Sequence, residues 1–307
     1  MAQNQAPNEE KKPLTAVTLF RKDSVQEQFD KLLGKKAPAF ITNVLQAVQN
    51  SDMLQTAEPL SILNAALKAA ALDLIVDPNF GQAWIIPYKD GKTGKTLAQF
   101  QMGWKGYVQL AHRSNQYEKM NAIAIHDNQF ISWNPLTEDL EVNMSVVGSG
   151  TIAGYAAYFK LKNGFYKVAY WSAEEVQKHA KKYSKSFGKG GGIGWNDKDN
   201  YDNMCLKTVL KNTINKWGIM SIEMQTAHLA DQAVIEEDGK YRYVDNEQVD
   251  QAEIARLEEN SRALRFIAKA ETMDDLEMII SGFPDMEPET REILDEKEKQ
   301  LKKQLKS

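Results

Sequence analysis

Apolar residues in the first quarter of the chain recur at the three- and four-residue spacing of amphipathic helices. The segment SVQEQFDKLLG predicts a helix that Ser24 caps and Gly34 ends. Two further helices are predicted, in APAFITNVLQAVQNS and in LSILNAALKAAALDL after Pro59. The last segment is rich in alanine and apolar on nearly all sides, so we expect this helix to be buried or to lie at a subunit contact.

A β-hairpin is predicted next, because QAWIIPYK and LAQFQMGW flank the turn DGKTGKT. The turn contains Gly-Lys-Thr twice, so a phosphate-binding P-loop has to be considered. That motif needs a glycine five residues before the Gly of Gly-Lys-Thr. Those positions hold Lys89 for Gly94 and Ile86 for Gly91. A P-loop also opens a helix, whereas this turn leads into a strand, so the motif is excluded.

Helical and strand-like patterns alternate through the middle of the chain. Residues 104–116 predict a helix, residues 117–170 are largely strand-like, and 173–183 predict another helix. The glycine-rich loop 188–194 lacks the spacing of a dinucleotide-binding fingerprint, so a mobile connector explains it at least as well as a phosphate cradle. A long helix is predicted from about residue 199 to residue 217.

The two ends of the chain differ from this centre. Residues 1–20 form a polar tail that we expect to be disordered. Residues 21–235 predict one α+β core, in which N-terminal helices and a central antiparallel sheet with hairpins pack with long helices. Residues 236–250 are typical of a linker, and residues 251–307 predict a small separate module of about three helices.

The net charge of −4 hides a separation of charge along the chain. Residues 1–159 contain 14 basic and 15 acidic residues, residues 160–218 contain 12 and 5, and residues 219–307 contain 12 and 22. The middle segment therefore has a charge of +7 and the last segment a charge of −10. This regional asymmetry indicates a polyanionic partner for the basic segment.

Composition excludes several other classes of protein. An apolar fraction of 42% and a charged fraction of 26% are typical of a soluble globular protein. No stretch approaches the roughly 20 apolar residues of a membrane span, and the first residues lack an apolar signal core. We therefore expect a cytoplasmic protein with no membrane partner. The single cysteine, Cys205, excludes an internal disulfide, and its apolar neighbours favour a small core thiol.

The predicted helix 199–217 has an apolar stripe that we expect to face the core, formed by Leu206, Val209, Leu210, Thr213, Ile214 and Trp217. Its polar sector contains Asn200, Lys207, Lys211 and Asn215. Lys207 and Lys211 are four residues apart, so their like charges repel, which a bound phosphate would relieve. A solvated lysine face is the usual alternative.

The predicted helix 104–116 has a similar arrangement. Its apolar side contains Trp104, Tyr107, Val108 and Ala111, and its polar side contains Lys105, Gln109, His112, Arg113 and Gln116. His112 alone would be an ordinary surface histidine. As part of a basic face, it becomes a candidate contact to phosphate or base.

A third basic element, KHAKKYSKSFGKGGG, interleaves lysines with aromatic rings. Its lysines are Lys178, Lys181, Lys182, Lys185 and Lys189. Lysines of this kind follow phosphates, while rings stack on unpaired bases. Tyr183 shares helical spacing with buried-type residues and suits a core equally well, so Phe187 is the better stacking candidate.

Signals for catalysis are weak. The four histidines stand apart without metal-ligand spacing, and the chain has neither GxSxG nor HExxH. Adjacent carboxylates such as Glu174 and Glu175 lie at a predicted helix start, where they favour the helix dipole. Carboxylates that converge only in space leave no mark in a sequence, so a metal-dependent nuclease stays open.

Three ordered blocks resemble the RecT family of phage recombinases. They are QFQMGWKGYVQLAHRSNQYEKMNAIAIHDNQF (99–130), GYAAYFKLKNGF (154–165) and YSKSFGKGGGIGWNDKDNYDNMCLKTVLKNTINKWG (183–218). The wider resemblance covers roughly residues 20–235. Several blocks in the right order and spacing are far more specific than one short motif.

The resemblance implies a single-strand annealing protein that assembles into rings or filaments on DNA, with an α+β core related to the annealing protein of phage lambda's Red system. It implies single-stranded DNA, the annealed duplex and further copies of the chain as partners. A phage exonuclease, or a host single-strand binding protein, is the expected partner of residues 251–307. The matching basic block positions are Gln109, His112, Arg113, Lys207 and Lys211. A phage or prophage origin in a bacterial host follows from the same resemblance.

These observations predict an ATP-independent annealing protein with no catalytic centre and no required cofactor, in which magnesium is bound only through the DNA. The three basic elements are expected to converge on one groove. The expected DNA contacts are Lys105, Gln109, His112, Arg113, Lys178, Lys181, Lys182, Lys185, Phe187, Lys207, Lys211 and Asn215. The alternatives are a metal-dependent DNA nuclease and a non-enzymatic adaptor protein.

Overall fold

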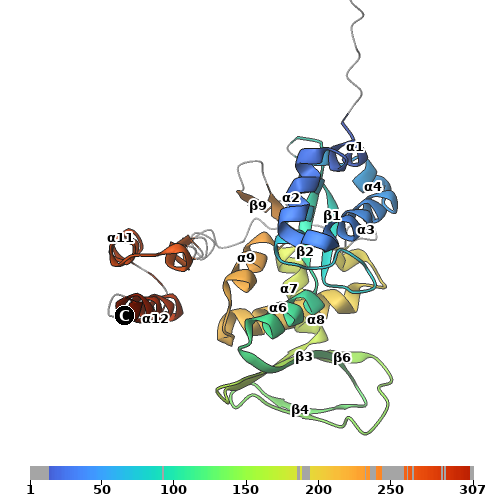
Figure 1. The fold of residues 1–307 in the computed structure, drawn as a ribbon. Coiled ribbons are helices and arrows are strands. Elements are labelled where there is room, and N and C mark those ends of the chain that lie inside the picture. Colours follow the sequence, from blue (N-terminus) through green and yellow to red (C-terminus); the bar gives the residue numbers. More distant parts are fainter. Residues whose placement is uncertain are drawn as a thin grey trace, which may run out of the picture.

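The computed structural model describes residues 14–91, 93–184, 187–188, 194–231, 233–235, 240–243, 259–260, 262–264, 266–284, 286 and 288–304. N-terminal helices lie at one end of the molecule, strands β3, β4 and β6 lie at the other, and long helices run between them (Figure 1). A further group of helices ends the chain. The predicted α+β fold is confirmed. No helix in these ranges is long and apolar enough to span a bilayer.

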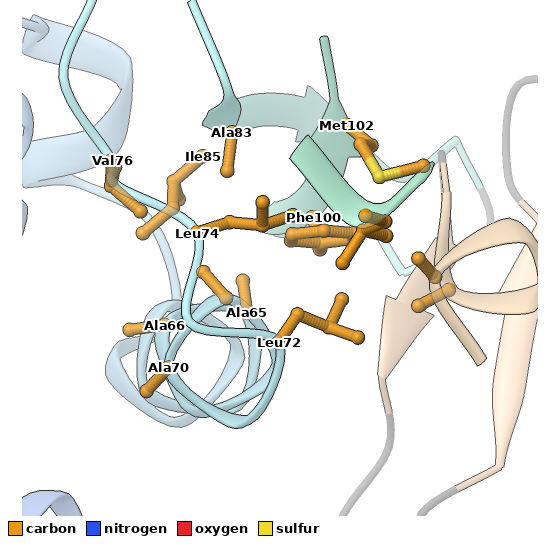
Figure 2. Close-up of a cluster of buried hydrophobic side chains, with 14 of the residues drawn as sticks. Ala65, Ala66, Ala70, Leu72, Leu74, Val76, Ala83, Ile85, Phe100 and Met102 are labelled. Atoms are coloured by element: carbon orange, nitrogen blue, oxygen red, sulfur yellow. The ribbon is translucent and has the colours of Figure 1, made fainter. Parts of the chain in front are cut away.

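The N-terminal helices pack on the first sheet. They are α1 (Ala16–Phe20), α2 (Asp23–Leu33), the 3-10 helix η1 (Gly34–Lys36), α3 (Ala37–Gln49), α4 (Asp52–Gln55) and α5 (Pro59–Ala71). Helix α5 is buried as predicted, and its small side chains allow the sheet to approach closely. Figure 2 shows Ala65 of α5 pointing toward the strands that carry Ile85 and Phe100.

Two predicted boundaries at this end are wrong. Residues 16–20 were expected in a disordered tail, but they form α1. Burial of Leu19 and Phe20 in the core stabilises this helix. Residues 1–13 lie outside the described residues. Helix α2 begins before Ser24, and its N-cap, Lys22, makes no side-chain capping bond. Gly34 ends α2 as predicted, with a φ of 53° that favours glycine.

The first sheet is antiparallel, in the order β1-β2-β8-β9. Its strands are β1 (Ala83–Lys89), β2 (Thr96–Met102), β8 (Ala233–Ile235) and β9 (Tyr241–Tyr243). Strands β1 and β2 form the predicted hairpin. Strand β9 lies within the predicted linker 236–250, so the core continues to residue 243. A contact between distant parts of the chain holds β9 on this sheet, because Arg242 pairs with the buried Asp90 at 3.2 Å, beside the β1–β2 turn. Residues 244–250 lie outside the described part.

The second sheet is also antiparallel, in the order β3-β6-β7. Its strands are β3 (Tyr117–His126), β6 (Ile152–Leu161) and β7 (Tyr166–Ser172). A hairpin of β4 (Phe130–Asn134) and β5 (Asp139–Val142) covers part of one face. Phe130 and Trp133 of this hairpin stack against Tyr170 of β7, with ring centroids 5.0 Å and 5.9 Å away. The strand-like region 117–170 is thereby confirmed.

The helices between the sheets are α6 (Trp104–Ser114), α7 (Ala173–Tyr183), the 3-10 helix η2 (Gly194–Asn196), α8 (Tyr201–Trp217) and α9 (Ile222–Ala230). Helix α7 begins as predicted, because Ser172 and Glu175 form a reciprocal capping box. Helix α8 packs against both α6 and the second sheet. The predicted core residues Val209, Leu210 and Ile214 are buried, whereas Trp217 is 43% exposed and does not belong to the core.

The C-terminal helices have a core of their own. Helices α11 (Met273–Gly282) and α12 (Pro288–Gln304) follow the helical residues 266–269, and together they bury Ile267, Ala270, Leu276, Ile279, Leu294 and Leu301. Asn260 links this group to the rest of the chain, since its amide donates to Gln225 of α9 at 3.4 Å and accepts from Thr290 at 2.7 Å. The module boundary at residue 251 stays a prediction, because 251–258 lie outside the described residues.

Two glycines permit a close backbone approach at the corner between β2 and α6. A Cβ added to Gly103 would lie 2.1 Å from the carbonyl oxygen of Gly81, and one added to Gly106 would lie 2.3 Å from that of Gln82. These distances are far shorter than van der Waals contact. Only glycine therefore lets the start of α6 lie against the segment before β1.

We expect Gly106→Ala to lower the free energy of unfolding by roughly 1–3 kcal/mol, because the added methyl group overpacks the corner. Inside an exposed helix the same change would stabilise by about 1 kcal/mol. Gly282→Ala in α11 is the control, since no atom lies within 4 Å of its added Cβ. Denaturant unfolding measures both variants, and equal stability of Gly106→Ala and the wild type would contradict the close approach.

Candidate nucleic-acid interface

Two adjoining cavities of about 110 Å³ and 540 Å³ form a groove between β1 and the start of α8. Both cavities are lined by Trp84, Ile86 and Asn200, so they belong to one surface. We call this surface the β1–α8 groove. Its polar and aromatic lining residues are Asn43, Gln46, Asn50, Ser51, Asp77, Asn79, Trp84, Gln101, Trp104, Lys105, Asp197, Asn200, Asn203 and Lys207.

The alternation of β1 decides which of its side chains belong to the floor of the groove. Successive residues of a strand point to opposite faces. Ala83 and Ile85 are therefore buried on the face that packs on α5 (Figure 2), and Trp84 and Ile86 are half-buried on the other face. Trp84 lies opposite Gln101 of β2. The alternation of apolar residues in the predicted hairpin places Trp84 on the face opposite Ile85, but sequence analysis did not assign Trp84 to a site.

The start of α6 forms one wall of the groove. The indole Nε1 of Trp104 donates to Oδ1 of Asn203 at 3.2 Å, and Nδ2 of Asn203 donates to Oδ1 of Asn200 at 2.8 Å. Lys105 is exposed, and its Nζ lies 6.0 Å from the centre of the Trp104 ring. Trp104 was expected on the core side of α6. It does pack against the core, but as the first residue of the helix it is only half-buried and also lines the groove.

This set of side chains is suited to unpaired nucleotides. Indole faces stack on bases, amide groups donate to phosphate oxygens or to base edges, and lysines pair with phosphates. The groove therefore combines the three kinds of contact that a single strand offers. Two indoles, several amides and the exposed Lys105 supply them.

A buried ionic cluster lies beside the groove. The carboxylate of Asp231 is inaccessible to solvent and accepts from Nζ of Lys207 at 2.7 Å and Nζ of Lys211 at 2.9 Å. Its Oδ1 also accepts from the backbone N–H of Met102 at 2.9 Å. We call Asp231, Lys207 and Lys211 the Asp231 cluster. It joins the end of β2, the middle of α8 and the residue that follows α9.

Burial and charge shift the protonation of this cluster in opposite directions. Burial alone would raise the pKa of Asp231, but the charges of Lys207 and Lys211 hold this pKa at about 2. Burial lowers the pKa of Lys207 to about 8, against the attraction of Asp231. Burial and the charge of Lys211 also lower the pKa of the neighbouring His228 to about 3, so its imidazole is neutral near pH 7.

The prediction that α8 presents an exposed pair of lysines is wrong, because both lysines belong to the Asp231 cluster. The side chain of Lys207 is 5% exposed and that of Lys211 is 24% exposed. Their repulsion is relieved by Asp231, not by an external phosphate. The acidic partner lies 24 residues after Lys207 and 20 after Lys211, at the end of a different helix, so periodicity within α8 gives no sign of it. A direct DNA contact of Lys207 or Lys211 stays a prediction.

The polar face of α6 is exposed as predicted. Gln109, His112 and Arg113 are all exposed, but they lie further along the helix, outside the residues that line the groove. The guanidinium of Arg113 donates to the carbonyl oxygen of Leu72 at 2.7 Å and lies 3.9 Å from Asp73. Arg113 therefore also holds α6 against the turn that follows α5.

The third basic element is only partly described. Lys178, Lys181 and Lys182 are exposed on α7, and Lys178 pairs with Glu174 at 2.8 Å. Phe187 is half-buried, and its ring lies edge-on to Trp195 with a centroid distance of 6.2 Å. Lys185 and Lys189 lie outside the described residues. Burial first, and then the charges of Lys182 and Lys211, lower the pKa of His179, so its imidazole is less basic than a free histidine.

Of the predicted contacts, Lys105 and Lys207 line the groove, and the remaining described ones do not. Asn215 is exposed at the far end of α8, where its amide bonds to the ring of His228. The groove residues that sequence analysis missed include Trp84 and the amides of Asn43, Asn50, Asn79 and Asn203. Within the described ranges, His, Cys, Asp and Glu side chains do not gather in groups of three suited to hold a metal ion.

Comparison with known proteins identifies the protein family of this chain. The model of the RecT family matches residues 38–251. An uncharacterized protein of Bacillus subtilis (strain 168), YqaK, is 44% identical over 245 residues, which cover 80% of each chain. Protein RecT of Escherichia coli (strain K12) is 23% identical over 247 residues, which cover 75% of this chain and 88% of that protein.

These matches show that the chain belongs to the RecT family. The resemblance of the three sequence blocks is thereby confirmed. The family is one of phage-type recombination proteins that anneal single-stranded DNA.

We expect Asp231→Asn to lower the free energy of unfolding by roughly 3–5 kcal/mol, because two largely buried ammonium groups lose their counter-charge. Lys178→Ala is the matched control, since it breaks the exposed ion pair with Glu174 and should change stability little. Thermal or denaturant unfolding measures both. Equal effects of the two variants would show that the Asp231 cluster contributes no more than a surface ion pair.

Proposed function

We propose that this protein binds single-stranded DNA in the β1–α8 groove and pairs it with a complementary strand, without ATP and without a catalytic centre. The observation that carries the proposal is the grouping of two indoles, an exposed lysine and a set of amides along one groove of a RecT-family chain. Base pairing supplies sequence recognition, so the protein needs only to hold one strand with its bases open.

Stacking supplies one part of the binding energy. Trp84 and Trp104 are half-buried on neighbouring elements of the groove, and we propose that their rings stack on unpaired bases. Such stacking contributes about 1–3 kcal/mol for each base and tolerates any sequence. A duplex keeps its bases stacked on each other, so the same contacts favour single strands.

Phosphate contacts supply the other part. Lys105 reaches the groove from α6, while Lys181 and Lys182 of α7 extend the basic surface beyond the Asp231 cluster. We propose that the backbone of the strand passes from the groove along α8 toward α7, with Lys211 and Asn215 beside its path. Neutralised phosphates repel the incoming strand less, so annealing becomes faster. The affinity of the protein for DNA should fall as the salt concentration rises.

Annealing releases free energy, so no nucleotide hydrolysis is required. Magnesium in this scheme is bound to the DNA and screens its phosphates. We further propose that copies of the chain assemble along the DNA as a ring or filament. The C-terminal helices, within residues 251–307, are proposed to bind a phage exonuclease or a host single-strand binding protein.

The purified full-length protein should speed the pairing of complementary oligonucleotides at low salt with magnesium, measured by fluorescence quenching of labelled strands. The spontaneous rate, and the rate with a non-complementary strand, are the controls. Pairing at the spontaneous rate would overturn the proposal. Shortened strands would indicate the alternative nuclease, and the absence of single-strand binding in a gel shift would indicate the alternative adaptor.

We expect Trp84→Leu and Trp104→Leu each to weaken single-strand binding by roughly 5- to 150-fold, which corresponds to about 1–3 kcal/mol of lost stacking. Leucine retains apolar volume, so the fold should be kept. Fluorescence anisotropy with a labelled oligonucleotide measures the affinity.

Phe266→Leu is the control for this pair, because its ring is 51% exposed in the C-terminal helices, outside both the groove and the proposed path of the strand. Lys105→Gln tests the electrostatic part, and should reduce the slope of log affinity against log salt by about 0.7. Equal affinities of the groove variants and Phe266→Leu would remove the groove from the binding site.

A further inference from the structure

Several exposed apolar side chains belong to β4, β5, the turn between them and the loop after β5. We call residues 127–150 the outer hairpin. Leu136 is 90% exposed at its turn and Val147 is 89% exposed in its loop, and Ile131 and Met144 of the same segment are more than half exposed. Fully solvated aliphatic groups of this size are costly to leave in water, and their concentration on one element marks an interaction surface.

This exposure is built into the outer hairpin and does not result from loose packing. The inward side of the hairpin is occupied, because Phe130 and Trp133 stack against Tyr170. The loop is held by side chains, since the amide of Asn128 donates to the carbonyl oxygen of Val147 at 2.8 Å and that of Gln129 donates to Val146 at 3.1 Å. The backbone thus holds Val147 in place with its side chain in solvent.

The charge of the outer hairpin favours a basic partner over DNA for this surface. Its charged residues are Asp127, Glu138, Asp139 and Glu141, and it contains no lysine or arginine. Among the described residues, Glu138 is the one of these that pairs with a lysine, Lys167, at 2.5 Å. Phosphates would be repelled. A partner must therefore present apolar side chains together with positive charge.

The chain itself presents such a surface at its opposite end. The segment 31–36, at the end of α2 and in η1, has the sequence KLLGKK and no acidic residue. Leu32 is 47% exposed among the exposed Lys31, Lys35 and Lys36. Lys36 already pairs with Asp73 at 2.9 Å, so Lys31 and Lys35 supply the positive charge for a partner. Figure 1 places α2 at one end of the molecule and β4 at the other. One molecule therefore does not bring its own two surfaces together.

We propose that the outer hairpin of one copy docks on segment 31–36 of a second copy. Leu136 and Val147 would pack beside Leu32, and the carboxylates would face Lys31 and Lys35. The two surfaces differ and lie at opposite ends, so the contact is head-to-tail and repeats from copy to copy, giving an open chain or a ring. The inference assigns the contact surfaces for the proposed assembly and does not depend on how the groove binds DNA.

The test uses two full-length variants. Leu136→Asp with Val147→Asp alters the outer hairpin, and Lys31→Glu with Lys35→Glu alters the docking segment. Each should raise the concentration of half-assembly at least about tenfold, measured by mass photometry and sedimentation, alone and with annealing strands. All four side chains are exposed, so unfolding temperatures should stay unchanged. Met278→Asp, at a side chain 66% exposed in α11, is the matched control and should assemble normally.

Mixing the two variants gives a sharper result. Each retains one working surface, so an equimolar mixture should form dimers that do not grow. The proposal is overturned if the wild type is monomeric in both conditions, or if the hairpin variant assembles like the wild type. Normal assembly of the lysine variant alone would also overturn it, since it indicates contacts between two hairpins. Binding of a short oligonucleotide by either monomeric variant reports on the groove separately, so failure of one proposal is distinguishable from failure of the other.

Discussion

Asp231 is buried without access to water, and elements distant in the sequence meet on its carboxylate. A desolvated carboxylate is tolerated only where cations and N–H groups surround it. The end of β2, the middle of α8 and the end of α9 therefore hold one another in place. Because Lys207 also lines the β1–α8 groove, the ion pair that joins the first sheet to α8 sets the position of one wall of the candidate site.

The groove that results is less cationic than the charge of the middle segment suggests. Part of that charge is already paired with carboxylates: Lys207 with Asp231, Lys178 with Glu174, and Lys167 with Glu138. Amides and indoles line the groove instead. A site of this composition holds a strand by many moderate contacts, and repetition over several copies adds them together. Modest total charge is then compatible with firm binding to a polyanion.

Charge is separated within the folded molecule as well as along the chain. The outer hairpin is acidic and apolar, the end of α2 is basic with one exposed leucine, and the two lie at opposite ends (Figure 1). The acidic hairpin repels phosphates, which favours DNA near α6, α7 and α8. The same separation allows neighbouring copies to attract each other without competing for the DNA surface.

The sequence by itself determined the local elements and the family. Apolar periodicity, the Ser172 cap and Gly34 defined helices, alternation defined the β1–β2 hairpin, and ordered blocks identified the RecT family. Tertiary structure alone decided what covers each helix face. Periodicity shows which residues share a face but not what lies opposite. The partner of Lys207, the exposure of Trp217 and the groove position of Trp104 all depend on residues from other elements, and only folding brings those together.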